Sequence, residues 1–147
     1  MNIIEALGAG SYSFALCLAA LGSALGSAEC GMAAVGAWKR CYLTNKKAPF
    51  ILIAFCGAPL SQTIYGMILM NAINSAPATV SGASKLFASI LGGIALGVSA
   101  WYQGKAGACA CDAMGETEKG FANYIMVIGI IETVALFVMV FLMTTLR

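Results

Sequence analysis

The sequence predicts an all-α integral membrane protein built from four transmembrane helices. Of its 147 residues, 61% are hydrophobic and 10% are charged, which leaves too few polar side chains to coat a water-soluble globule. Four apolar runs are long enough to cross about 30 Å of hydrocarbon as helices. They cover residues 11–38, 50–73, 86–111 and 121–146. The connections between them are short, so we expect residues 1–147 to form a single membrane domain.

Charge and residue types exclude several classes of function. A formal net charge of +2 is too small and too scattered for a nucleic-acid-binding surface. Histidine is absent from the sequence, which removes the commonest imidazole metal ligand and the usual catalytic base. The sequence contains no P-loop. Most of the six cysteines lie in apolar runs and none has C-x-x-C spacing, so we expect them to serve as packing residues.

Basic residues predict the orientation in the membrane. The first connection carries four of them and the third carries Lys119, whereas the opposite ends offer only Lys85 and Arg147. Because Lys and Arg near the ends of spans favour the cytoplasm, we expect the first and third connections to be cytoplasmic. Both termini would then lie outside.

The two halves of the chain resemble each other. The run LGSALGSAECGMAAVGA precedes a polar connection in residues 11–73, and LGGIALGVSAWYQGKAGACACDAMG does so in residues 86–146. Each is followed by a bulkier helix with one polar residue near its middle, so that Gln62 aligns with Glu132. The pattern predicts a duplicated helical hairpin whose two copies are parallel.

Helix composition favours self-association. Gly, Ala or Ser fill 14 of the 24 positions in 15–38 but only three of the 26 in 121–146. Small residues let helices approach closely, whereas the bulky second and fourth helices can face lipid. Since four helices cannot enclose all the small-residue faces, we expect a closed homo-oligomeric ring with the first and third helices inside. An ordinary tight bundle is the alternative.

Glu132 is the strongest candidate functional residue. It lies about twelve residues into the last apolar run, near mid-membrane, where an ionised carboxylate costs at least about 2.5–3.5 kcal/mol. A proton, a paired positive charge or a bound cation must neutralise it. One competing interpretation is that Lys105 pairs with Glu132. Alternatively, Lys105 pairs with Glu29 between the first and third helices, or extends to the membrane surface.

Other polar residues are predicted to lie near this carboxylate. Ser61, Gln62 and Tyr65 share one side of the second helix, and Gln103 adds an amide from the third. Counted from the predicted cytoplasmic ends, Gln62 and Glu132 lie at a depth of about 18 Å and Gln103 at about 13 Å. Pro59 lacks an N–H and therefore leaves nearby backbone carbonyls available.

These groups are hard oxygen donors, which suit a hard cation rather than a soft metal, and the single carboxylate matches a monovalent ion. Proton carriage would leave the cost of burying the other polar groups unexplained. The simpler alternative is that the polar groups only join helices by hydrogen bonds.

The segments APLSQTIYG, AWYQGKAG and IIETVALF together resemble the four-helix proteolipid, or K/c subunit, of rotary V-type ATPases, and the likeness extends over essentially the whole chain. More narrowly, they are similar to the sodium-binding bacterial members. The resemblance implies that a Na⁺ is coordinated by the following groups: the Ala58 backbone carbonyl, the Ser61 hydroxyl, the Gln62 and Gln103 amide oxygens, and the Glu132 carboxylate. Tyr65 would hold that carboxylate in place.

The resemblance also implies a function. The chain would be a rotor-ring subunit in a bacterial plasma membrane, carrying one Na⁺ per subunit without itself hydrolysing ATP. Its expected partners are other copies of itself, a stator subunit with a membrane arginine, and central-stalk subunits at the cytoplasmic loops. The alternatives are the same ring carrying H⁺ and a small dimeric four-helix exporter.

Overall fold

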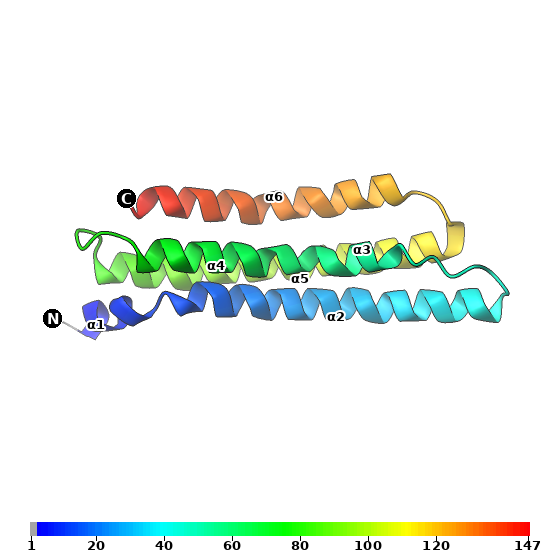
Figure 1. The fold of residues 1–147 in the computed structure, drawn as a ribbon, viewed down its shortest axis with the longest axis horizontal. Helices are drawn as coiled ribbons and strands as arrows, with labels where there is room; N and C mark the ends of the chain where they lie inside the picture. The colour runs from blue at the N-terminus through cyan, green and yellow to red at the C-terminus, as the bar shows by residue number, and fades with distance from the viewer. Residues whose placement is uncertain (1–2) are drawn as a thin grey trace.

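The computed structural model describes residues 3–147, and every regular element among them is helical (Figure 1). The elements are α1 (Ile3–Gly10), α2 (Ser13–Leu43), α3 (Leu52–Gly57), the 3₁₀ turn η1 (Ala58–Leu60), α4 (Ser61–Asn74), α5 (Gly82–Thr117) and α6 (Phe121–Thr145). Consecutive α3, η1 and α4 form one span, Leu52–Asn74. Together with α2, α5 and α6 it gives four helices long and apolar enough to cross a membrane, which confirms the predicted fold class.

The helices lie side by side along one long axis. The connections 44–51 and 118–120 lie at one end, and α1, the C-terminal end of α6 and the connection 75–81 lie at the other (Figure 1). Helices α2 and α5 therefore run in the same direction, and α4 and α6 run opposite to them. Helices α4 and α5 lie between α2 and α6, because each of them packs against both and against the other.

Two helices extend further than the apolar runs predicted. Helix α2 continues to Leu43 and α5 to Thr117, beyond the predicted ends at residues 38 and 111. The extensions carry charged side chains that pair across the two helices: Arg40 forms ion pairs with Asp112 and, at 2.5 Å, with Glu116. Because these pairs join helical turns outside the apolar runs, hydropathy alone places the helix ends too early.

Helix α1 was not predicted. Its Glu5 carboxylate accepts a hydrogen bond of 2.7 Å from the backbone N–H of Gly82, the first residue of α5. A carboxylate at a helix N-terminus satisfies a backbone donor that has no intrahelical partner and interacts favourably with the helix dipole. Helix α1 is thereby fastened to the start of α5.

Glycines bring α2 and α5 into backbone contact. A Cβ atom added to Gly22 would overlap the Gly97 backbone, and one added to Gly104 would overlap Gly26. Such close approach supplies packing between membrane helices, where lipid gives no hydrophobic driving force.

We expect Gly22→Ala to destabilise the bundle by at least about 1–3 kcal/mol, the usual cost of overpacking, because neither backbone can move without displacing its helix. The matched control is Gly31→Ala in the same helix, since a Cβ atom there meets nothing within 4 Å. Thermal unfolding in detergent, followed by circular dichroism, compares the two. Equal midpoints for both variants would show that this helix contact is not tightly packed.

Candidate ion-binding site

The site begins where the second span changes its helical geometry. Pro59 is buried within η1, the 3₁₀ turn between α3 and α4. A proline inside a helix cannot donate its backbone hydrogen bond, which accounts for the local change. Just after it, the Ser61 hydroxyl lies 3.0 Å from the Ala58 carbonyl oxygen and 3.1 Å from Gln62 Oε1. Two acceptor oxygens thus share the single proton of the Ser61 hydroxyl. The region around Ser61 therefore has more acceptor oxygens than side-chain protons to satisfy them.

Further hydrogen bonds join the Ser61 region of α4 to α5 and α6. Gln62 Nε2 donates to Gln103 Oε1 on α5 at 2.7 Å, and Gln103 Nε2 donates to Glu132 Oε2 on α6 at 3.2 Å. The Tyr65 hydroxyl donates to Glu132 Oε1 at 2.6 Å, which returns the circuit to α4. Gln62 and Gln103 are completely buried. The structure therefore brings together all six residues that the sequence singled out.

Contact between Gln103 and Glu132 removes the depth mismatch that was estimated from the sequence. That estimate assumed that the helices end at one level, but α5 continues to Thr117. Gln103 Nε2 also lies 3.2 Å from the Ile128 carbonyl oxygen on α6. The side chain is therefore fixed at the level of the carboxylate.

The Glu132 side chain accepts hydrogen bonds from neutral donors, Tyr65 and Gln103. Within residues 3–147, the ion pairs are those of Arg40 with Asp112 and Glu116, at the end of the bundle. Across that same part of the chain, no lysine or arginine pairs with Glu132. The site is thus a carboxylate surrounded by neutral oxygen and nitrogen groups.

Neither of the two pairings considered for Lys105 occurs among the described residues. Its ammonium lies over the rings of Trp101, 4.3 Å from the ring centre, and Tyr102, at 5.2 Å. Glu29 instead accepts a hydrogen bond of 2.8 Å from the Trp101 indole nitrogen. Trp101 therefore stands between the two charges, because its ring face attracts the cation while its N–H satisfies the carboxylate. The ammonium of Lys105 is therefore stabilised by aromatic rings and makes no ion pair with Glu132.

Ser99 belongs to the site, although it was not among the residues predicted from the sequence. Its hydroxyl donates to the backbone carbonyl of Ile131 at 3.0 Å, next to Glu132, and thereby ties α5 to α6. Ser99 precedes Gln103 by four residues, and residues at that spacing share a helix face. This four-residue spacing from Gln103 is the feature of the sequence that could have indicated Ser99.

The fold and site define the chain as an integral membrane protein with a carboxylate–amide cluster shared by the second, third and fourth spans. Residues 86–144, which include Gln103 and Glu132, match the family model for the C subunit of ATP synthase. The matched segment covers most of α5 and α6, so it is this second hairpin that is similar to the C subunit of ATP synthase. No curated protein matches the chain.

Proposed function

We propose that the chain is the rotor-ring subunit of a V-type rotary ATPase and carries one Na⁺ at Glu132. The observation that carries the proposal is the chain of hydrogen bonds that runs from Gln62 through Gln103 to Glu132 and Tyr65, in which the partners of the membrane carboxylate are neutral. An ionised carboxylate near the middle of the membrane requires compensation. A small monovalent cation provides it with one unit of charge.

The oxygen inventory fits Na⁺ as the transported ion. Five groups supply oxygens: the Ala58 carbonyl, Ser61, Gln62, Gln103 and Glu132. Ala58, Ser61 and Gln62 Oε1 are already neighbours within 3.1 Å of the serine hydroxyl. Rotation of a carboxamide about its last bond exchanges its oxygen and nitrogen, so either glutamine can turn an oxygen toward a cation. Tyr65 would position the carboxylate rather than bind the ion.

The number of polar groups favours Na⁺ over H⁺ as the cargo. A proton needs only the carboxylate, whereas Ser61, Gln62 and Gln103 add oxygens that a cation can use and whose burial is otherwise costly. The same ring carrying H⁺ is the second candidate.

Electrostatics would couple ion transfer to rotation. A site that holds Na⁺ is neutral and can pass through lipid, while an empty Glu132 is charged and is stable only beside a compensating cation. A stator subunit with a membrane arginine would provide that cation, so ions would exchange only there. Central-stalk subunits would dock on the loops 44–51 and 118–120, which the basic residues assign to the cytoplasm, in a bacterial plasma membrane.

Carbodiimide labelling tests the cargo. A hydrophobic carbodiimide reacts with protonated carboxyls in the membrane and should modify Glu132, and Na⁺ at neutral pH should slow that reaction. Glu29, the other membrane glutamate, is the internal control, because its partner is Trp101 and its labelling should not depend on Na⁺. Both positions can be followed by peptide mass spectrometry. If Na⁺ gives no protection and only a lower proton concentration does, the rotor carries H⁺.

Assembly separates a rotor from a small exporter. Exporters of this size with one membrane glutamate work as dimers, whereas a rotor subunit forms a closed ring. The outer faces of α2 and α6 expose large apolar side chains, among them Leu21, Leu25, Val127 and Phe137, which lipid or neighbouring copies would cover. Native mass spectrometry of the detergent-extracted protein should give one large homo-oligomer. A dimer would exclude the ring.

A further inference from the structure

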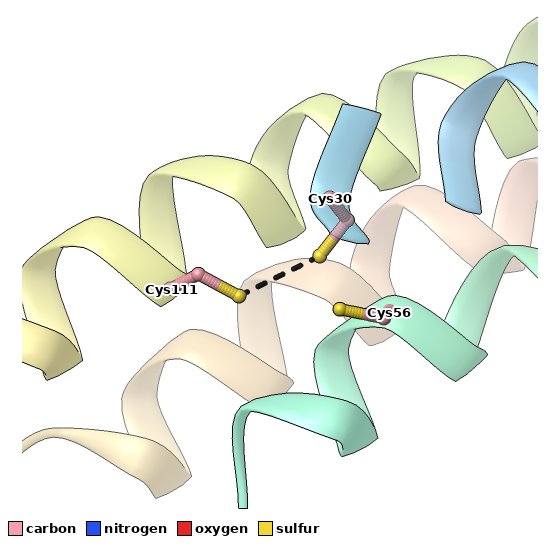
Figure 2. A group of neighbouring side chains, drawn as sticks. All are labelled: Cys30, Cys56 and Cys111. Carbon is pink, nitrogen blue, oxygen red and sulfur yellow. Dashed lines mark hydrogen bonds between the residues drawn. The ribbon is translucent and has the colours of Figure 1, made fainter. Parts of the chain in front are cut away.

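Three cysteines from three helices converge inside the bundle (Figure 2). Cys30 on α2, Cys56 on α3 and Cys111 on α5 place their sulfur atoms within 4.8 Å of one another. The Cys30 and Cys111 sulfurs are 3.6 Å apart, and all three thiols are free. Gly107 makes room for the group, because a Cβ atom there would lie 2.8 Å from the Cys30 sulfur.

Apolar packing buries two of the three thiols, and Cys56 is partly buried. Cys30 and Cys111 are completely buried, within a core cluster that includes Ala34, Leu52 and Phe55. The Leu52 backbone carbonyl accepts weak hydrogen bonds from Cys56, at 3.5 Å, and from Cys111, at 3.9 Å. Among the described residues, the cluster brings together sulfur ligands without an acid. It is chemically the opposite of the oxygen site around Glu132.

The spacing suits a metal ion bound by three sulfurs. A metal at the centre of a sulfur triangle, with bonds of about 2.3 Å, needs sulfurs about 4 Å apart. The Cys30 and Cys111 sulfurs are 3.6 Å apart and all three sulfurs lie within 4.8 Å of one another, which is compatible with that spacing. Thiolates select soft ions such as Cu(I), whereas structural zinc requires four ligands. Three sulfurs without a fourth protein ligand therefore favour Cu(I).

The ligand form of cysteine is the thiolate. Binding of Cu(I) by the three sulfurs therefore releases the thiol protons to water, so the affinity should depend on pH.

We propose that Cys30, Cys56 and Cys111 form a binding site for Cu(I) that links α2, α3 and α5. Cys56 precedes Ala58 by two residues, so a bound ion would also brace the helix irregularity at η1. Cys111 follows Gln103 by eight residues, about 12 Å along the helix, so the two sites are separate. The proposal does not depend on the cargo of the oxygen site.

Anaerobic titration tests the site. The purified full chain, reduced and checked by mass spectrometry for free thiols, is titrated with Cu(I) in competition with a Cu(I)-specific chelator. We expect one Cu(I) per chain and, in the X-ray absorption spectrum of the wild-type protein, a shell of three sulfurs. Cys56→Ser should weaken binding by more than about tenfold, a loss that even an outer-shell residue can cause.

The control is the double variant Cys17→Ser with Cys109→Ser, which removes two exposed thiols and should bind Cu(I) as the wild type does. Circular dichroism of Cys56→Ser checks that it is folded, and the wild-type absorption spectrum does not depend on any variant. Absence of binding, a shell containing nitrogen or oxygen, unchanged affinity in Cys56→Ser or lost affinity in the control would each overturn the proposal. Failure of Na⁺ to bind at Glu132 would overturn the proposed cargo but would not affect the Cu(I) site.

Discussion

Replacement of Glu132 by glutamine is expected to abolish Na⁺ binding while the helices remain folded. The amide can still accept a hydrogen bond from Tyr65, which now lies 2.6 Å from Glu132 Oε1, but it cannot neutralise a cation. Removing one partner of a buried charge pair costs about 3–5 kcal/mol, so affinity should fall by at least about a hundredfold. Binding of radioactive Na⁺ to the purified protein measures the loss.

The matched control for this prediction is Glu29→Gln. It removes the other membrane carboxylate and its contact with Trp101, and it should leave Na⁺ affinity unchanged. If Glu132→Gln fails to assemble or unfolds, the carboxylate has a structural role instead. Undiminished Na⁺ binding by that variant would place the ion elsewhere in the protein.

Gln103→Leu is expected to impair both stability and ion binding. The substitution leaves the Gln62 amide without its partner at 2.7 Å, and Gln62 is completely buried. An unsatisfied buried polar group costs about 1–3 kcal/mol. Loss of one oxygen ligand and of one donor to Glu132 should reduce Na⁺ affinity by about tenfold or more, since hydrogen bonds to charged groups contribute about 1.5–3 kcal/mol.

The double variant Gln62→Leu with Gln103→Leu separates the two effects. It removes both amides, so no unpaired group remains between them, and stability should recover relative to Gln103→Leu. Na⁺ binding should stay impaired, because two ligands are now missing. Thermal unfolding and Na⁺ binding are measured on all three variants. Recovery of binding together with stability would mean that the glutamines only join the helices.

Hydropathy was sufficient to predict the four spans, because a membrane helix must be apolar over its whole crossing. The helix ends were less well predicted. Beyond the apolar runs, α2 and α5 continue as helices whose charged side chains pair, Arg40 with Asp112 and Glu116, and no pattern in either segment alone indicates that contact. Duplication of the hairpin and the membrane orientation stay predictions.

The candidate site was predictable as far as residues share one helix. Spacings of one, three and four placed Ser61, Gln62 and Tyr65 together, and the structure joins them to one network. The register between helices is set by close glycine contacts such as Gly22 with Gly97, which hydropathy does not contain. Hence the depth of Gln103 was underestimated, and the contact of Lys105 with Trp101 was not predicted.

The thiol cluster also depends on the register between helices, which the sequence does not reveal. Cys30 and Cys111 are 81 positions apart, and Cys56 belongs to a third helix. No local spacing relates them, so a packing role was the reasonable expectation. Only the register of α2, α3 and α5 brings the sulfurs together (Figure 2).

Electron cryomicroscopy of the assembled protein in saturating sodium chloride tests the central claim most directly. We predict a compact density among the oxygens of Ser61, Gln62, Gln103 and Glu132, with the glutamine oxygens turned toward it and Tyr65 still bonded to the carboxylate. A vacant pocket, or one filled by the ammonium of Lys105, would contradict the account.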